Sequence, residues 1–163
     1  DQDEKFLNYI FELLVLNFLL NIVILILTSC EHSQMNIPTN AINKLKEFKQ
    51  KEKFMEDMSV FYPGIGNEEL RPILSAHINQ AADDFKVLIE SGLKNEKDFQ
   101  DKIELGLQRF SGIYLDLDTE DRERICHYFE ELMEIVGLES SDGHLNNFLY
   151  DFDPSGADEQ KNG

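Results

Sequence analysis

The 163-residue sequence has little of several things that stabilise small proteins. It has two cysteines, Cys30 and Cys126, so at most one disulfide can form and no framework of bridges holds the fold together. It has no tryptophan, and its aromatic residues are mainly phenylalanine. Because the length allows one domain and 42% of the residues are hydrophobic, a packed apolar core must provide the stability.

Basic residues are also scarce. The chain carries 15 lysines and arginines against 32 aspartates and glutamates, which gives a formal net charge of −17. A surface of this sign repels the phosphates of nucleic acids and keeps a protein soluble. We therefore expect no nucleic-acid partner.

The sequence has no Gly-rich phosphate loop, nucleophile elbow, zinc motif or redox cysteine pair. Gly64-Ile65-Gly66 is too short to be a dinucleotide fingerprint. The acidic run 116–121 resembles the start of a calcium loop, but such a loop counted from Asp116 requires glycine where Asp121 stands and glutamate where His127 stands. Helix capping explains the run without a metal. The sequence therefore predicts neither a cofactor nor a metal site.

The longest hydrophobic run covers residues 13–27 and is interrupted only by two asparagines. This length is typical of a signal peptide, whereas a membrane-spanning helix needs about 20 apolar residues. The run ends in Leu27-Thr28-Ser29-Cys30, which resembles the lipobox of bacterial lipoprotein precursors: an aliphatic residue, two small residues and the cysteine that receives the lipid. The segment predicts a lipoprotein-type signal over residues 1–29 and a lipid anchor on Cys30.

The N-terminal flank departs from this pattern, because Asp1, Asp3 and Glu4 outweigh Lys5 where a signal peptide is basic. The alternative is an uncleaved membrane anchor or a buried helix of the domain. With the lipid anchor, the protein is expected in the bacterial cell envelope, membrane-anchored and facing the periplasm or the surface.

Residues 30–39 are predicted to be a tether, residues 40–154 a helical domain and residues 155–163 a disordered tail. No segment alternates at period two, so the fold class is all-α, an irregular bundle of four main helices plus a short C-terminal helix. The signals that bound these helices are, in order, Thr39 or Asn40, Pro72 and Gly92, Asn95, Asp118 and Gly137, and Ser141 or Asp142 before a helix at 145–150.

The predicted helices have apolar stripes at intervals of three and four residues. Their expected core residues are Ile42, Leu45 and Phe48; Leu74, Ile78, Ala81, Phe85 and Leu88; Phe99, Ile103, Gly106 or Leu107, and Phe110; and Ile125, Tyr128, Phe129, Leu132, Met133 and Val136. Gly106 weakens the third helix by about 1 kcal/mol relative to alanine, which suggests that a neighbour approaches closely there. Residues 111–115 are predicted to be non-helical.

Several segments together resemble one family of small bacterial proteins that is catalogued only as a domain of unknown function. The segments are Phe61–Ile65, Glu69–Pro72, Asp118–Cys126, Tyr128–Met133, Val136–Ser141 and Phe152–Pro154. The resemblance runs from about Leu45 to Pro154 and is most specific over residues 118–141. It implies a compact, mainly helical domain, sometimes carried behind a lipoprotein signal, and it implies no activity.

Few residues suggest chemistry. His77 and Asp84 share a helix face, and a histidine beside a carboxylate can transfer protons, but apolar neighbours favour His77 as a boundary residue. Cys126 is predicted to be an inert thiol, because the adjacent His127 points about 100° away on a helix. His127 and His144 are expected to be exposed.

Five lysines cluster close to the predicted anchor, and they either attract anionic lipid headgroups or form a solvated face with Glu47 and Glu52. The solvated face is the favoured interpretation. The five are Lys44, Lys46, Lys49, Lys51 and Lys53.

These features favour a non-enzymatic binding or interaction module, exported as a membrane-anchored lipoprotein, whose contacts are the membrane and a protein partner. An inhibitor that covers a basic protein is one version of this hypothesis. The turn-rich loop Phe61–Ile65 is the first candidate for the contact patch, and packing on the core is the equal alternative. The other hypotheses are a small hydrolase-like enzyme that uses His77 and Asp84, and a structural envelope protein.

Overall fold

A computed structural model describes residues 13–15 and 34–153. The predictions for the signal segment, for Cys30 and for the tail at 155–163 lie outside these residues. The chain divides into two units, 1–33 and 34–163. Residues 13–15 of the first unit are helical and exposed. None of the helices in the described part of the chain has both the length and the hydropathy that a membrane span requires.

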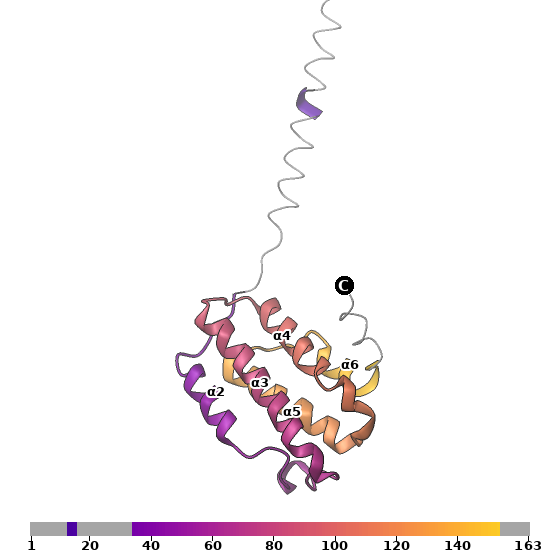
Figure 1. Cartoon of the computed structure of the whole chain (residues 1–163). Helices are drawn as coiled ribbons and strands as arrows, with labels where there is room; N and C mark the ends of the chain where they lie inside the picture. Colours follow the sequence, from indigo (N-terminus) through magenta and orange to yellow (C-terminus); the bar gives the residue numbers. More distant parts are fainter. Residues whose placement is uncertain (1–12, 16–33, 154–163) are drawn as a thin grey trace, which may run out of the picture. The chain divides into compact units, whose positions relative to one another are not determined.

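The second unit is a bundle of α-helices (Figure 1). The prediction of an all-α fold is confirmed, and the described residues contain no β-strand beyond two isolated bridges. Helix α3 contacts α2, α4 and α5, and α6 packs against α4 and α5. The helices are α2 (Ala41–Gln50), α3 (Arg71–Glu90), α4 (Glu96–Gln108), α5 (Thr119–Val136) and α6 (His144–Tyr150), with the 3₁₀ helices η1 (Met58–Val60), η2 (Glu68–Leu70) and η3 (Ser111–Asp116) between them.

Helix ends follow the predicted capping residues in most cases. The Asn95 side chain accepts a hydrogen bond from the Lys97 amide at 3.1 Å, and Asp118 accepts one from the Asp121 amide at 2.8 Å. Gly137 ends α5 in the left-handed region, with φ +75°. Each of these caps satisfies a backbone group that the helix leaves unpaired.

Two local predictions are wrong. Helix α6 follows Gly143, without a side-chain cap from Ser141 or Asp142. The segment predicted to be non-helical forms η3, because the Ile113 amide bonds the Phe110 carbonyl at 3.0 Å and extends the turn that ends α4.

The predicted tether packs on the domain along part of its length. The Met35 side chain is buried, and its amide donates to the Lys94 carbonyl at 2.7 Å. The second compact unit of the chain therefore includes residues 34–39. A single buried methionine in a polar segment gives no periodic signal that sequence reasoning can use.

The core is built largely from phenylalanine. Phe85 and Phe99 pack edge to face with ring centroids 5.3 Å apart, and both are fully buried, as is Phe129. Gly106 faces Phe129, and a Cβ added to Gly106 would lie 2.7 Å from the Phe129 ring. The predicted close approach at Gly106 is therefore confirmed.

We expect Gly106→Ala to lower the free energy of unfolding by about 1 kcal/mol, since overpacking against a buried ring outweighs the gain in helix propensity. Urea unfolding checks this. The matched control is Gly112→Ala, because a Cβ at Gly112 meets nothing within 4 Å. Equal stability of the wild type and Gly106→Ala would contradict the expectation.

Candidate functional site

The loop between α2 and α3 lies at one end of the bundle, the lower end in Figure 1. Its segment Met55–Phe61, named here the apolar loop, presents four apolar side chains to solvent. Met55 is 46% exposed, Met58 59%, Val60 41% and Phe61 82%. A group of exposed apolar residues in one short segment marks an interaction surface more often than scattered ones do.

The tip of the apolar loop is closed by backbone hydrogen bonds. The Asp57 amide donates to the Tyr62 carbonyl at 2.8 Å, and the Tyr62 amide donates back at 3.0 Å. The Asp57 carboxylate accepts from the Ser59 hydroxyl at 2.5 Å and lies 3.3 Å from Arg124. The hydrogen bond from Ser59 and the charge of Arg124 lower the pKa of Asp57. Phe61 has φ +56°, a left-handed conformation that bulky residues rarely adopt without support from their surroundings.

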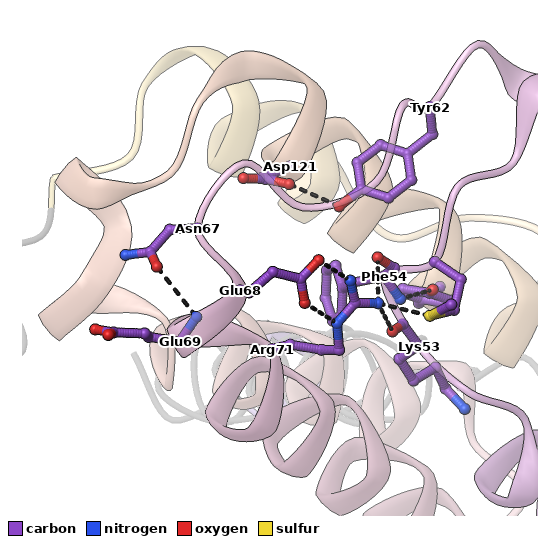
Figure 2. A network of polar contacts seen from close by, with 10 residues as sticks. Lys53, Phe54, Tyr62, Asn67, Glu68, Glu69, Arg71 and Asp121 are labelled. Carbon is purple, nitrogen blue, oxygen red and sulfur yellow. Dashed lines mark hydrogen bonds and ion pairs between the residues drawn. The ribbon is translucent and has the colours of Figure 1, made fainter.

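Arg71, the first residue of α3, ties the start of this loop to the bundle (Figure 2). Its Nη1 donates to the Phe54 carbonyl at 2.7 Å, to the Lys53 carbonyl at 3.2 Å and to Met55 Sδ at 2.8 Å. Its Nε and Nη2 donate to the carboxylate of Glu68, with 2.7 Å for the Nε bond. One planar guanidinium thus binds three consecutive residues of the loop.

Lys53 is buried, with 3% of its surface exposed. Its Nζ donates to the carbonyls of Phe48 and Lys51, the second at 2.9 Å, and lies 4.3 Å from the centroid of the Phe48 ring. Burial lowers the pKa of Lys53 to about 8, against the opposing charge of Glu131.

The predicted solvated lysine face is therefore wrong for Lys53 and is modified for two other lysines. Lys49 pairs with Asp83 on α3 at 2.6 Å, and Lys51 pairs with Glu131 on α5. Lys49 and Lys51 therefore pair with residues of neighbouring helices at the surface, and such exposed pairs contribute little to stability. The alternation of lysine and glutamate along the chain did not reveal these long-range partners.

Tyr62 anchors the far end of the apolar loop (Figure 2). Its hydroxyl donates to the Asp121 carboxylate at 2.7 Å, and both residues are buried. Burial raises the pKa of Asp121, and the hydrogen bond from Tyr62 opposes that shift. The pKa of Tyr62 is also raised, first by burial and then by Asp121.

The loop Phe61–Ile65, which was predicted either to form a contact patch or to pack on the core, is divided between the surface and the core. Phe61 points to solvent, whereas Tyr62 and Ile65 belong to the core. Phe54, which also has a positive φ of 59°, is fully buried and donates its amide to the Tyr128 hydroxyl at 2.7 Å.

An acidic rim lies beside Phe61. A pocket of about 20 Å³ is lined by Phe61, by Glu120 and Glu123 on the first turns of α5, and by His127. Glu120, Glu123 and His127 are exposed, as predicted for His127. Arg124, which lines the same pocket, is engaged with Asp57 and stacks 4.7 Å from the Tyr128 ring. The local field around Phe61 is therefore negative.

The predicted acid–base pair does not form. Asp84 binds Arg109 at 2.5 Å, and the His77 ring packs edge to face on Phe110 with centroids 5.2 Å apart. Burial and the charge of Arg109 lower the pKa of His77. In the described region no hydrogen bond joins His77 to Asp84, so the geometry does not favour the hydrolase-like alternative.

The remaining candidates have structural surroundings. Cys126 is buried, its Sγ lies 3.7 Å from the Leu145 carbonyl, and burial raises the pKa of the thiol to about 12, which agrees with an inert thiol. His144 is half-buried at the start of α6, so its predicted place in an exposed loop is wrong. Within residues 13–15 and 34–153, no three side chains of metal-ligating type are grouped to hold an ion.

Sequence reasoning missed Arg71, Lys53 and the exposure of Met55 and Met58. Only one local signal was present, namely Arg71 immediately before the helix-starting Pro72 and three residues after Glu68. That spacing is typical of an ion pair on one turn.

Residues 34–153 thus form a small all-α domain that presents an exposed apolar loop. The chain belongs to the DUF4844 family, a domain of unknown function, whose sequence profile matches residues 36–153. It is similar to a DUF3571 family protein from Acinetobacter baumannii of known crystal structure, with 31% identity and a TM-score of 0.62 over 74% of this chain and 93% of that one. No curated protein matches the chain. The predicted family resemblance is confirmed, and the family assigns no activity.

Proposed function

We propose that this domain is a non-enzymatic interaction module whose apolar loop docks into a partner protein that has an apolar pocket flanked by basic residues. The observation that carries the proposal is Phe61, which is 82% exposed on a loop closed by the Asp57–Tyr62 hydrogen bonds. A protein gains nothing in stability from holding a phenylalanine in water in a left-handed conformation, so a role in contact explains it.

An ordered loop favours binding, because its backbone has already lost its conformational entropy when the domain folds. Arg71 and Tyr62 attach its two ends to the bundle, so association loses little further backbone entropy. Aromatic residues are enriched among interface residues that dominate affinity, and methionine side chains adapt to irregular surfaces. Phe61 is then the anchor, with Met58 and Val60 around it.

The charge near Phe61 supports a basic partner surface. Glu120 and Glu123 share a pocket with Phe61, and no cation of the described residues forms an ion pair with either. With a net charge of −17, the chain attracts a basic surface and repels an acidic one. This supports the inhibitor version of the hypothesis, in which the covered protein is basic.

We further propose that the domain is displayed from a membrane through lipid on Cys30. This rests on the resemblance of Leu27–Cys30 to a lipobox. The intact mass of the chain extracted from membranes tests it: residues 30–163 plus a lipid adduct supports the anchor, and an unmodified, uncleaved mass contradicts it.

A photo-reactive benzoylphenylalanine in place of Phe61 tests the docking surface in the expressing cell. We expect a covalent adduct with one protein, and we expect that added wild-type chain suppresses it. The chain with Phe61→Asp should compete at least about 10-fold less well, as for loss of a dominant contact. Adduct formation is read on gels and identified by mass spectrometry.

The matched control is Leu115→Asp, because Leu115 is 80% exposed outside this loop. It should compete as the wild type does. Glu120→Gln with Glu123→Gln should weaken the competition, whereas Glu134→Gln with Glu139→Gln, also at exposed positions, should not. Absence of any adduct at position 61, or equal loss with Leu115→Asp, contradicts the proposed function.

A further inference from the structure

We propose that Met55 and Met58 form an oxidation site on the apolar loop, at which a peroxide converts the thioethers to sulfoxides and Arg71 binds the sulfoxide oxygen of Met55. The chain has four methionines, and they divide into two classes. Met55 and Met58 are 46% and 59% exposed, whereas Met35 and Met133 are 6% and 8% exposed. Exposure controls how readily a thioether is oxidised, so the two loop methionines react first.

The chemistry is a transfer of one oxygen atom. A lone pair on Sδ attacks the outer oxygen of the peroxide, the O–O bond breaks and the S–O bond forms. Sulfur is oxidised by two electrons. The transferred oxygen loses its proton, and the remaining peroxide oxygen takes up that proton and leaves as water or an alcohol. Methionine sulfoxide reductases reverse the change, with one enzyme for each sulfoxide epimer.

Arg71 distinguishes Met55 from an ordinary surface methionine. Its Nη1 already lies 2.8 Å from Met55 Sδ, and the Phe54 carbonyl and Glu68 fix the same guanidinium in place. A thioether is a weak acceptor, whereas a sulfoxide oxygen beside a cationic donor forms a charge-assisted hydrogen bond. In the described part of the chain no group donates to Met58 Sδ, so only the Met55 sulfoxide gains this bond.

The consequence for binding rests on the proposed function. Oxidation replaces two apolar side chains of the docking surface with polar ones, while the added bond to Arg71 keeps the loop attached to the bundle. The modified loop is then ordered but no longer apolar. Oxidation releases the partner without unfolding the domain.

The first test uses the full chain alone, with hydrogen peroxide as the probe and peptide mass spectrometry as the readout. We expect Met55 and Met58 to gain oxygen on the order of 10-fold faster than Met35 and Met133. Similar rates at all four, or faster oxidation of a buried methionine, would overturn the proposal. Because no partner is present, this result is independent of the docking proposal.

The second test separates the bond to Arg71 from mere exposure. Mild oxidation of the wild type should raise its thermal midpoint by a few degrees, and oxidation of Met55→Leu, which reacts only at Met58, should leave the midpoint unchanged. A fall for the wild type, or the same rise in both proteins, would show that Arg71 does not bind the sulfoxide.

The third test connects the site to docking. Oxidised chain should compete poorly for the adduct formed at position 61, and the double variant Met55→Leu, Met58→Leu should compete equally well before and after peroxide treatment. Equal loss of competition in the double variant would overturn the assignment of these two residues. If no adduct forms, the docking proposal fails while the oxidation site stands on the first two tests.

Discussion

Replacing Tyr62 with phenylalanine is expected to lower the free energy of unfolding by about 3 kcal/mol at neutral pH, because it removes one partner of a buried, charged hydrogen bond. Tyr62 and Asp121 are each 3% exposed, and the tyrosine hydroxyl is the donor 2.7 Å from the carboxylate. In the variant the Asp121 carboxylate remains buried but has lost this donor. Chemical denaturation of the two proteins measures the difference.

The size of this loss depends on pH in a defined direction. Burial raises the folded-state pKa of Asp121 above the ordinary value of 3.8, and loss of the tyrosine hydrogen bond raises it further. Below that ordinary value the carboxyl is protonated in both folded and unfolded chains, so the cost of burying a charge is absent. As pH rises, Asp121 ionises first in the folded wild type and at higher pH in the folded variant, so the deficit of the variant develops between these two pKa values. The deficit of Tyr62→Phe should therefore shrink to about 1 kcal/mol in acid, the value of a neutral hydrogen bond.

The matched control is Asp121→Asn, which keeps an acceptor for the tyrosine hydroxyl and removes the buried charge. At neutral pH its stability should lie within a few tenths of a kcal/mol of the wild type, because asparagine loses the favourable interaction of a negative charge with the N-terminus of α5. In the Asp121→Asn background, Tyr62→Phe should cost about 1 kcal/mol. Additive losses in the double variant would mean that the two side chains do not interact.

Tyr62→Phe should also weaken docking, and by more than the loss of stability alone explains. Tyr62 follows Phe61 directly, and its hydroxyl attaches that end of the apolar loop to α5. At temperatures where both proteins are fully folded, Tyr62→Phe should compete less well for the partner than Gly106→Ala, which perturbs the core away from the loop.

The sequence predicted the helical framework well because its signals are local. Asn95, Asp118 and Gly137 act within one turn of the helix that each one bounds. The stripe from Phe99 to Phe110 has the period of a helix, and its four predicted core residues are all buried. Such features depend on neighbours in the chain, which a single sequence displays.

The candidate site was predicted only in part, because its parts are distant in sequence. Phe61–Ile65 was identified as a contact loop from its turn residues, but nothing local shows that Tyr62 meets Asp121 or that Arg71 binds the Phe54 carbonyl. Lysine is rarely buried in proteins, so the sequence predicts that Lys53 is exposed. Its burial results from the close approach of Phe48 and Tyr128, which is a tertiary effect.

Lys53→Met is expected to raise the free energy of unfolding by about 2 kcal/mol at pH 7, since a methionine fills similar space without a charge to bury. The folded-state pKa of about 8, against 10.5, corresponds to a penalty of about 3 kcal/mol while the amine is charged in both states. The variant escapes this penalty but loses the hydrogen bonds to the Phe48 and Lys51 carbonyls, and that loss reduces its net advantage to about 2 kcal/mol.

The pH dependence identifies the cause. Below about pH 8 the amine is charged in folded and unfolded chains, so the advantage of the variant is constant. Between about 8 and 10.5 the folded chain loses the proton first, so the wild type recovers the penalty of about 3 kcal/mol. The difference should then reverse, to about 1 kcal/mol in favour of the wild type, which keeps its hydrogen bonds. Cys126 acts in the opposite sense above pH 9, because its thiol ionises more readily when unfolded, but it does so equally in both proteins. The difference between the two unfolding curves therefore reports Lys53 alone.

We expect that Lys53 contributes to the order of the apolar loop and not to the stability of the fold. Lys53 binds the carbonyl of Phe48 in α2 and that of Lys51 just after the helix, and its own carbonyl accepts from Arg71. It therefore helps to set where the chain leaves the helix toward the apolar loop. We expect amide hydrogen exchange over Met55–Phe61 to be faster in Lys53→Met, even though the rest of the domain exchanges more slowly. Opposite changes in the two regions would show that the chain gives up stability to hold this loop. Slower exchange everywhere would mean that the charge does not order the loop and that Arg71 and Tyr62 suffice.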